Sequence, residues 1–497
     1  INGFRMLNSI KKYSGPLLLI FFFFAIFLQN IRPIHSYNVD VWWHLKSGQW
    51  IAENGLPSED PFSFTTPQKT SERKHILLKG YWLSQSSYYL LYKSAGFKGL
   101  VLFNAFVFTL ILFLIWKALR NFGLAPFEAC LLMVPLINMD YPNIRPQVFS
   151  FLFAVLLFYF MEKGLKSLDD EPSRHPRAMI AMPVVMLLWS NLHQGFIVGY
   201  GMLGIYLFSE AFSFARKKDL LSKSRFKTVS LYVSLSLLSS LINPNFIYSP
   251  VYVFKTLLIP TPLKKNIIEY LNPFEYATYT GDMTSLFKII AVALFVITQM
   301  VTSLKRLKLR DLLLFAFFAT AALSSVRFGA FLMYFSVAIS GRYLSPLLAR
   351  YRQRLGVYFA FGCLLLSIYL IAASNPTSLK RKPVDTTFLP VGAVDFIKDR
   401  RLPAQIFNPY EWGGYLIWRL YPEYKVFSDS RMLDYGVQLK YETARGGMKT
   451  AVFDEFGINT VIFYPVYINK LTPPIVLSLL KDPNWSSRAQ VGKWGEE

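Results

Sequence analysis

Long apolar runs alternate with short polar segments from the start of the chain to residue 373. The runs cover residues 15–31, 100–116, 125–137, 148–161, 178–189, 196–214, 229–242, 287–301, 312–323, 328–339 and 356–373. A straight crossing of a bilayer needs about 20 helical residues, so the shorter runs must borrow polar flanking residues or be broken near a cavity. The pattern predicts an all-α polytopic membrane protein with about eleven transmembrane helices.

The residues after the last run are less apolar and mix two patterns. Residues 394–400 have a helical pattern. Short strand-like runs follow at 406–407, 415–418, 425–427 and 460–464. Because turn residues separate these elements, the tail is expected to form a small α/β domain.

The composition agrees with a lipid environment, since 53% of the 497 residues are hydrophobic. The formal net charge of +23 would suggest nucleic-acid binding in a soluble protein. No RNP, zinc-finger or basic-helix pattern accompanies this charge, however. The basic residues lie in clusters between apolar runs, which is the positive-inside signal. Membrane lipids with anionic head groups are therefore the expected partners, and nucleic acid is not.

The charge clusters also give an orientation. If the first run starts inside, the five inner loops are all basic, with clusters at 117–120, 163–177, 216–227, 305–310 and 342–354. The N-terminus is then inside and the tail outside. We therefore expect a transmembrane domain, residues 1–374, and an extracytoplasmic α/β domain, residues 375–497. The inner charges are expected to be solvated and to anchor their loops.

The same orientation gathers the unusual polar residues on the outer face. These residues are Asp40, His44, Asp60, Tyr141, Arg145, His193, Asn243 and Arg327. Several of them come from the first outer loop, residues 32–99, and from short turns between runs. A functional site is therefore expected to face outward.

The first outer loop opens with the segment Asp40-Val41-Trp42-Trp43-His44. If residues 40–52 form a helix, Asp40 and His44 lie on one face, four residues apart. Such a helix would lie in the membrane interface, with its aromatic side chains in lipid and its acid toward a pocket. The alternative is that Asp40 is a helix N-cap and that the tryptophans only anchor the loop.

Several motifs in a fixed order resemble a known family. They are WHL at 43–45, DPFSFT at 60–65, WLSQ at 82–85, RPQ at 145–147, NLHQGF at 191–196, NP at 243–244, SVR at 325–327, FNPYEWGGYLIW at 407–418 and DSR at 429–431. In this order the chain resembles the bacterial polytopic glycosyltransferases of the GT-C superfamily. The resemblance covers nearly the whole chain and implies a GT-C-like fold.

The resemblance also implies a reaction. Members of that superfamily transfer a sugar from a polyprenyl phosphate to an acceptor with inversion, and a carboxylate in the first outer loop acts as base. By position this role falls to Asp40, because a weak hydroxyl nucleophile needs a group that takes its proton. The departing phosphate needs cations, and Arg145 and Arg327 are the outer arginines suited to it.

Two departures from the family pattern affect the expected site. Tyr81 stands where relatives often carry an acid, so Asp60 is the candidate for a second carboxylate. Asp40 is followed by Val41 and Trp42 rather than by a second acid, so no D-x-D pair is present. We therefore expect a site without metal or other cofactor.

Other polar residues have structural alternatives. His193 is either a substrate contact or a hydrogen-bonded histidine at a helix end, and Asn243-Pro244 is better explained as a helix stop. Tyr141 and His44 are expected to contact substrate. Arg327 lies between two apolar runs, where an arginine is costly unless it has a function. Aromatic residues of the tail, such as Trp412 and Trp418, could bind sugar rings or form a core.

The function expected from these observations is an inverting glycosyltransferase in a bacterial inner membrane, with its tail in the periplasm. Its partners would be a polyprenyl-phosphate sugar, an acceptor glycan, lipid or protein, and membrane lipids, with a complex with other membrane proteins left open. The second candidate is a subunit or scaffold that keeps the fold without catalysis. A transporter is less favoured, because no mid-span acids pair with the outer ones and no inverted repeat occurs.

The orientation can be tested with one cysteine. A cysteine placed at Ser430 should react with a membrane-impermeant thiol reagent in intact spheroplasts, because the tail is expected outside. Reaction only after lysis would reverse the topology and place the site on the other face.

Overall fold

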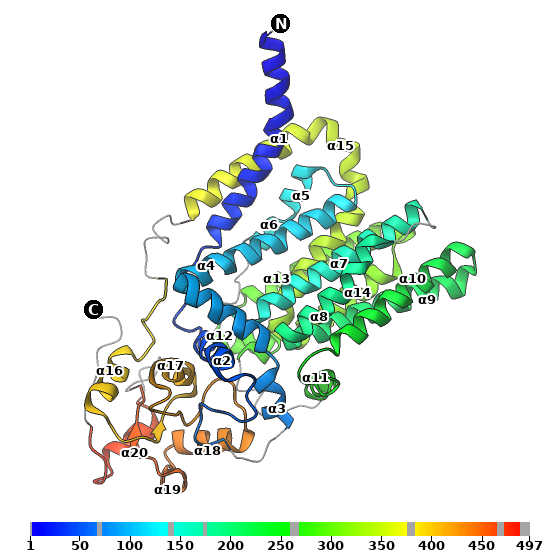
Figure 1. Ribbon diagram of the computed structural model, residues 1–497. Helices are drawn as coiled ribbons and strands as arrows, with labels where there is room; N and C mark the ends of the chain where they lie inside the picture. Colours follow the sequence, from blue (N-terminus) through cyan, green and yellow to red (C-terminus); the bar gives the residue numbers. More distant parts are fainter. Residues whose placement is uncertain are drawn as a thin grey trace. The chain divides into compact units, whose positions relative to one another are not determined.

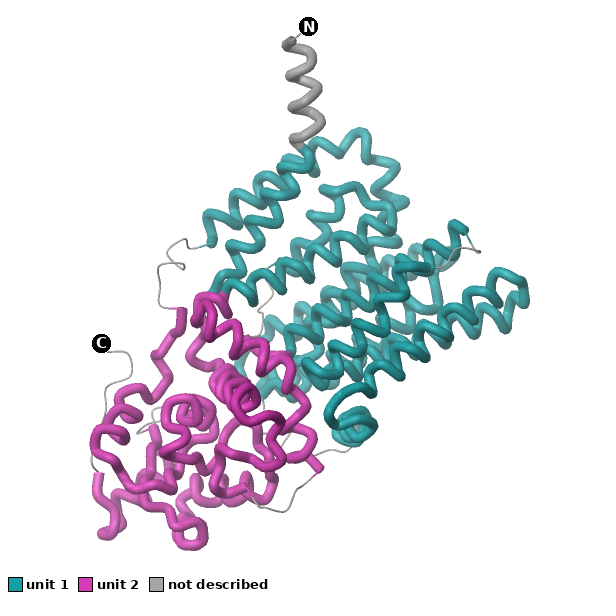
Figure 2. Tube along the Cα trace, in the orientation of Figure 1, with its two compact units in different colours: residues 1–32, 102–142, 147–380 teal, residues 33–101, 143–146, 381–497 magenta. Residues whose placement is uncertain are grey.

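The computed structural model describes residues 2–66, 72–137, 144–171, 176–258, 268–374, 383–464 and 472–487. Its contacts divide the chain into two units (Figure 2). Unit 1 comprises residues 1–32, 102–142 and 147–380, and unit 2 comprises residues 33–101, 143–146 and 381–497. Unit 2 thus combines the first outer loop with the tail, two segments that the sequence assigns to different domains.

Unit 1 is helical throughout its described part (Figure 1). Its α-helices are α1 (Asn2–Gln29), the second part of α4 (Trp82–Asn121), α5 (Pro126–Leu132), α6 (Val134–Ile137), α7 (Gln147–Asp170), α8 (Ala181–Leu192), α9 (Ile197–Lys217), α10 (Leu220–Ser240), α11 (Tyr248–Leu258), α12 (Pro273–Thr280), α13 (Thr284–Thr302), α14 (Leu309–Ser324) and α15 (Gly329–Ala373). Short 3₁₀ turns join some of them: η1 (Arg177–Ile180), η2 (Gln194–Phe196), η4 (Ile268–Tyr270), η5 (Leu304–Arg306) and η6 (Val326–Phe328).

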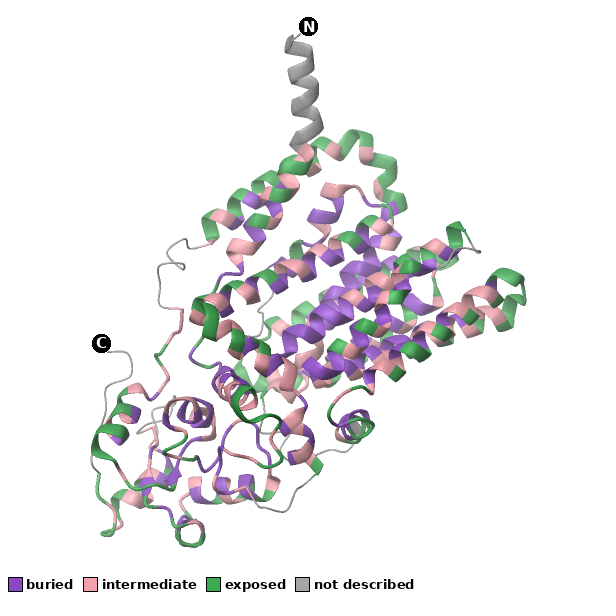
Figure 3. Ribbon diagram, in the orientation of Figure 1, coloured by how far each residue is buried: buried purple, intermediate pink, exposed green. Residues whose placement is uncertain are grey.

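Helix α7 lies at the centre of unit 1, whereas α13 lies at its surface (Figure 3). Buried residues make up 78% of the most apolar stretch of α7 but only 28% of that of α13. The outward side chains of α13 are nevertheless apolar, and Phe287 and Leu294 are 63% and 60% exposed. An apolar outer surface of this kind is stable in lipid rather than in water.

Five helical stretches of the described chain are long and apolar enough to cross a membrane. They are Glu72–Asn121, Gln147–Asp170, Gln194–Lys217, Thr284–Thr302 and Val326–Ala373. The protein is therefore a helical membrane protein, as expected. The last two apolar runs of the sequence both fall within α15, which contains Pro346 and packs against α1. The count of about eleven crossings stays a prediction.

A kink in α4 marks where the first outer loop ends. Gly96 has φ +61° inside α4, a left-handed conformation that glycine adopts without steric cost. The residues before the kink belong to unit 2, and the apolar run at 100–116 follows it. The expected end of the first outer loop at residue 99 stays a prediction.

A network of ion pairs lies inside unit 1. The Glu162 carboxylate on α7 lies 3.0 Å from the Arg310 guanidinium of α14 and 2.5 Å from the Arg342 guanidinium of α15. Arg342 also pairs with Asp311 at 2.9 Å. The side chains of Glu162 and Asp311 are 2% and 0% exposed, so the network is enclosed.

The network continues to α9 and α10. The Arg225 guanidinium pairs with Glu210 at 2.9 Å and with Asp169, and Arg310 lies 3.5 Å from the same Glu210. The expectation that the inner arginines are solvated is wrong for Arg225, Arg310 and Arg342. Their acidic partners lie on other helices, and one sequence does not show which helices are neighbours.

Unit 2 is a mixed α/β structure. Its elements are α2 (Asp40–Asn54), α3 (Glu72–Lys79), the first part of α4, α16 (Val391–Arg400), β1 (Ile406–Phe407), α17 (Tyr410–Leu420), α18 (Tyr435–Arg445), α19 (Thr450–Phe456), β2 (Thr460–Val461) and α20 (Pro474–Leu480). Strands β1 and β2 pair in parallel, with Ile406 opposite Thr460. Val426 adds bridges to Ile406 and, in the first outer loop, to Ser63.

The elements of the tail follow the sequence pattern in part. The expected helix at 394–400 lies within α16, the expected strand at 406–407 is β1, and the expected strand at 460–464 is shortened to β2. The run at 425–427 is not a strand, because Val426 forms only isolated bridges. The run at 415–418 is not a strand, because it lies inside α17. Its apolar residues Tyr415, Leu416 and Ile417 are all buried, so α17 is enclosed on several sides and loses the one-sided pattern of a surface helix.

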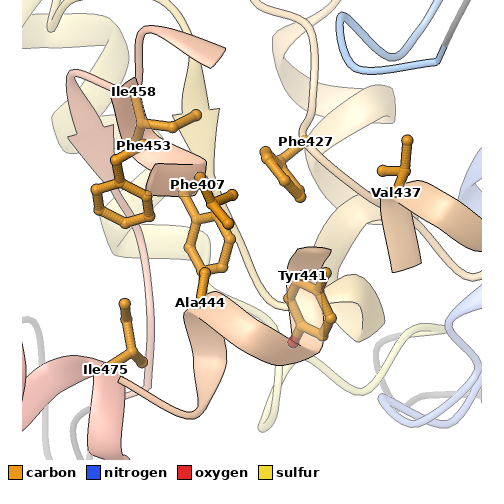
Figure 4. Packing of buried hydrophobic residues seen from close by; sticks show 9 residues of the cluster. Phe407, Phe427, Val437, Tyr441, Ala444, Phe453, Ile458 and Ile475 are labelled. Carbon is orange, nitrogen blue, oxygen red and sulfur yellow. The ribbon is translucent and has the colours of Figure 1, made fainter. Parts of the chain in front are cut away.

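Aromatic side chains form the core of the tail (Figure 4). Phe407 of β1 contacts Phe427, Tyr441 and Phe453, with ring centroids 4.9, 5.6 and 5.2 Å apart. Ile475 of α20 and Val437 of α18 complete the cluster. Offset and edge contacts of this kind stabilise a core beyond simple burial.

The ion-pair network of unit 1 should carry much of its stability. Arg310→Gln leaves Glu162 buried without its main partner, and breaking a buried ion pair typically costs about 3–5 kcal/mol. Asp169→Asn is the matched control, because Asp169 is 45% exposed and an exposed pair contributes about 0–1 kcal/mol. We expect Arg310→Gln to lower the thermal unfolding temperature in detergent far more than Asp169→Asn. Equal effects would mean that the network is dispensable.

Candidate functional site

Asp40 stands at the start of α2 in unit 2. The N-cap of this helix is Val39, which makes no side-chain cap. The Asp40 carboxylate instead accepts hydrogen bonds at Oδ1 from Ser430 Oγ (2.6 Å) and Trp43 Nε1 (3.1 Å). Arg145 Nε lies 3.2 Å from Oδ2. The alternative that Asp40 only caps the helix is therefore wrong.

The Asp40 side chain remains 21% exposed and that of Arg145 18% exposed. The carboxylate is thus oriented by three donors and is still reachable from solvent. Asn38, which is fully buried, fixes the segment that carries Arg145, because its Nδ2 donates to Ile144 O at 3.2 Å. Charged donors hold a carboxylate more firmly than neutral ones, so the Arg145 contact is a strong part of this arrangement.

Close backbone approaches place α2. A Cβ atom at Gly48 would lie 2.1 Å from Gln85 O on α4, and one at Gly414 would lie 2.5 Å from Val39 O. Both positions accept only glycine unless the backbone shifts. Gly414 of the WGGY segment thus lets α17 pack directly against Val39, the residue before Asp40.

The tryptophans of α2 are packed inside unit 2. Trp42 and Trp43 are 4% and 7% exposed, and Trp42 meets Phe97 and Tyr415 edge to face. The expectation that these aromatic side chains lie in lipid is wrong. The Trp43 indole instead bonds both Asp40 and Ser430, at 3.1 and 3.0 Å from Nε1.

The DSR segment of the tail holds both acids of the first outer loop. Ser430 donates a hydrogen bond to Asp40. The next residue, Arg431, donates two hydrogen bonds to Asp60, with Nη1–Oδ1 at 2.8 Å and Nη2–Oδ2 at 3.3 Å. Arg431 also bonds Asp429, with Nη2–Oδ2 at 2.7 Å. Two acids about twenty residues apart in one loop are therefore fixed by adjacent residues of the tail.

Asp60 is enclosed in this arrangement. Its side chain is 1% exposed, and Phe62 N also donates to Oδ1 at 3.2 Å. Burial alone would raise the pKa of Asp60, but the charge and hydrogen bonds of Arg431 outweigh it, so the pKa lies below its ordinary value. Asp60 is thus a paired anion, and its expected place as a second carboxylate of a substrate-binding site stays a prediction.

His44 lies behind Trp43, with ring centroids 3.6 Å apart, and is 4% exposed. Its Nδ1 has no hydrogen-bond partner within the described residues. Burial, followed by the charges of Arg145 and Arg431, holds the pKa of His44 well below its ordinary value. His44 is therefore neutral at pH 7 and cannot supply a cation there.

His193 belongs to unit 1, at the junction of α8 and η2. Its Nδ1 lies 2.6 Å from Ser150 Oγ and accepts a hydrogen bond from Gly195 N at 3.0 Å. Trp189 Nε1 donates to the same Ser150 Oγ at 2.7 Å. These contacts fit the structural alternative of a hydrogen-bonded histidine at a helix end. Substrate contact by His193 stays a prediction.

Arg327, in η6 of unit 1, is half-buried. Its Nη1 donates to Tyr270 Oη at 2.8 Å, and its guanidinium lies 5.3 Å from the centroid of that ring. Arg145 belongs to unit 2, so the expected convergence of the two arginines on one anion stays a prediction. Tyr141 lies outside the described residues. In the described part of the chain, no three His, Cys, Asp or Glu side chains are grouped as metal ligands.

Sequence reasoning expected Asp40, Arg145 and Ser430 on the outer face, which stays a prediction, and it missed how they meet. It also missed Trp43 as a donor, because the pattern of α2 suggested a lipid anchor. Ser430 is more enclosed than a labelling site should be. Met448, which is 72% exposed, is the better position for the cysteine in the topology experiment.

No family model and no curated protein matches the chain. Among solved structures, it resembles the Archaeoglobus fulgidus oligosaccharyltransferase in the apo form, with 10% identity, a TM-score of 0.58, and coverage of 91% of this chain and 70% of that one. The same enzyme tethered to an acceptor peptide with the NVT sequon gives 10% identity, a TM-score of 0.55, and coverage of 91% and 69%. The archaeal oligosaccharyltransferase AglB from that organism, in complex with an inhibitory peptide and a dolichol-phosphate, gives 11% identity and a TM-score of 0.57. The match covers 91% of this chain and 70% of that one.

At this identity the likeness concerns the fold. The chain shares the fold of these archaeal oligosaccharyltransferases over most of its length. The bacterial origin and the subtype suggested by the motifs are not part of this finding.

The Asp60–Arg431 pair predicts a pH-dependent contribution to stability. Asp60→Asn should lower the free energy of unfolding by about 1.5–3 kcal/mol at pH 7, the usual worth of hydrogen bonds to charged groups. Because the pKa of folded Asp60 is depressed, this contribution is complete above the unfolded value of about 3.9 and is lost as the pH falls through the folded value.

Thermal unfolding of wild type and Asp60→Asn at pH 7 and near pH 3 tests this pH dependence of the stability. The difference in unfolding temperature between wild type and Asp60→Asn should be smaller at the lower pH. The control, Asp395→Asn, removes a carboxylate that is 51% exposed and should unfold at nearly the wild-type temperature at either pH. If the difference in unfolding temperature between wild type and Asp60→Asn did not change with pH, the ion pair would not be its source.

Proposed function

We propose that the protein is an inverting glycosyltransferase that moves a sugar from a polyprenyl-phosphate donor to an acceptor at the outer face of the membrane. The observation that carries this proposal is the Asp40 carboxylate, which is partly exposed yet oriented by Ser430, Trp43 and Arg145. Its position after the first span, in a chain with a GT-C-like fold, is where the family resemblance puts the base.

The proposed reaction is a single displacement. The acceptor oxygen or nitrogen attacks C1 of the donor sugar, the bond from C1 to the phosphate oxygen breaks, and Asp40 takes the proton of the attacking group. Ser430 and Trp43 both bind Oδ1 of Asp40, so the carboxylate keeps its direction during the transfer. The proton then passes from Asp40 to solvent, which returns the site to its starting state.

The lipid phosphate is the leaving group in this scheme. Its charge grows as the bond to C1 breaks, and nearby guanidinium groups stabilise that charge. Arg145 and Arg327 are the proposed donors, because each presents planar N–H groups suited to phosphate oxygens. The similar archaeal enzyme is described in complex with a dolichol-phosphate, which supports a lipid-phosphate carrier for this chain too.

The acceptor and the setting are also part of the proposal. The resemblance favours a bacterial inner membrane with unit 2 in the periplasm, and a glycan, lipid or protein as acceptor. The site is proposed to work without a metal, since Asp40 is followed by Val41 and Trp42 rather than by a second acid. The second candidate is a scaffold that keeps the fold, and it needs no reactive carboxylate.

Asp40→Asn tests the proposal most simply. The amide keeps the shape of the side chain but cannot take the acceptor proton, and general-base catalysis is typically worth about 10²–10⁴ in rate. Turnover in reconstituted vesicles should fall by that factor, while thermal stability and donor binding change little. Asp395→Asn is the control for loss of a carboxylate elsewhere in unit 2.

If Asp40→Asn kept more than about a tenth of wild-type turnover, the base would have to be another group. If the folded wild-type protein bound a polyprenyl-phosphate sugar but transferred nothing to any acceptor tried, the scaffold would be favoured.

A further inference from the structure

The two oxygens of the Asp40 carboxylate have different surroundings. Oδ1 receives both neutral donors, Ser430 Oγ and Trp43 Nε1, which also bond each other at 3.0 Å. Oδ2 faces Arg145 Nε at 3.2 Å. Within the part of the chain that the structure describes, Arg145 is the group that contacts Oδ2. Oδ1 is thus held by a fixed pair, and Oδ2 is covered by one long side chain.

The donors also differ in how easily they can leave. Trp43 is 7% exposed and packs against His44 and Tyr81, so its indole has little room to move. The Arg145 side chain is 18% exposed, and an arginine side chain has several rotatable bonds. Oδ2 is therefore the oxygen that an acceptor can reach, provided that Arg145 moves.

A phosphate can compete with Asp40 for Arg145. A guanidinium binds phosphate and carboxylate oxygens with the same planar N–H groups, and a phosphate offers more charge and more acceptor oxygens. The Arg145–Asp40 pair is partly exposed, at 18% and 21%, so a phosphate can approach Arg145 and compete with the single carboxylate oxygen that it contacts.

We propose that Arg145 covers Oδ2 of Asp40 in the resting protein and moves to the donor phosphate when the lipid-linked sugar binds, which opens Oδ2 to the acceptor. This inference rests on the proposed function. It makes Arg145 a residue that links the two substrates, because the base becomes available only after the donor is in place. A sugar donor bound next to a covered base would be protected from attack by a stray acceptor or water until Arg145 has turned.

The inference can be tested without measuring transfer. The full-length protein in nanodiscs is treated with a water-soluble carbodiimide and an amine, and the amide formed at Asp40 is quantified by peptide mass spectrometry relative to that at Asp395. The additions are a short-chain polyprenyl monophosphate, the matching prenyl alcohol, or inorganic phosphate. We expect the monophosphate to raise the relative labelling of Asp40 about two- to five-fold, the factor expected when one partly exposed ion pair is broken.

Arg145→Gln should label Asp40 at the higher level without any addition and should not respond to the monophosphate. Arg145→Lys keeps the charge and should still respond, which separates loss of the contact from misfolding. Arg419→Gln removes a comparable pair, Arg419–Asp395, whose atoms lie 2.6 Å apart. In that variant labelling of Asp40, measured against total protein, should respond as in wild type.

Other outcomes also decide the question. A rise with inorganic phosphate would support the inference, because it shows that the head group is sufficient. An equal rise with the prenyl alcohol, no rise with the monophosphate, a fall in labelling, or a response that persists in Arg145→Gln would overturn it. None of these results depends on turnover, so they stand apart from the Asp40→Asn experiment.

Discussion

The Asp40 carboxylate is the point at which three distant parts of unit 2 meet. Its own helix supplies Trp43, the segment before α7 supplies Arg145, and the tail supplies Ser430. A carboxylate that is mostly buried is costly unless it is paired, and Asp40 has three partners and remains 21% exposed. Glycine is needed at 48 and 414, because Gly48 lies against the backbone of Gln85 on α4 and Gly414 of α17 lies against the backbone of Val39.

The tail therefore helps to build the site. Arg431 binds Asp60, and Ser430, its neighbour, binds Asp40, so the fold of the tail determines where the two acids of the first loop lie. Asp60 is held as an anion by a buried guanidinium, which suits a structural role. That leaves Asp40 as the acid of this pair with solvent access, and it explains how one loop can carry two acids with different tasks.

Unit 1 contains buried charges that must be balanced within a helical structure with an apolar surface. Its helices present apolar side chains outward and bury their charges in a network that includes Glu162, Arg310 and Arg342. Buried charges in pairs tolerate a low dielectric, whereas single ones do not. The network also joins helices that are far apart in sequence, so it fixes their packing as well as their charge balance.

The sequence predicted the local features well. Apolar periodicity predicted most of the helices, and the charge of the loops singled out Asp40 and Arg145 as residues to examine. It could not predict pairings between segments, because Asp40 and Ser430 are 390 residues apart and no local pattern records their contact. The ion partners of Arg310 and the burial of Trp42 also depend on contacts between distant segments, so they could not be predicted either. The helix α17 was mistaken for a strand because its enclosed residues are apolar on several sides.

The stereochemistry of transfer tests the central claim most directly. The proposed mechanism is a single displacement with Asp40 as the base, and it leaves no part for Asp60 as a nucleophile, because Asp60 is paired with Arg431. NMR of the product from a donor of known anomeric configuration should therefore show inversion at C1. Retention would require a covalent intermediate or a second reactive carboxylate, and would contradict the account of Asp40 as the sole base.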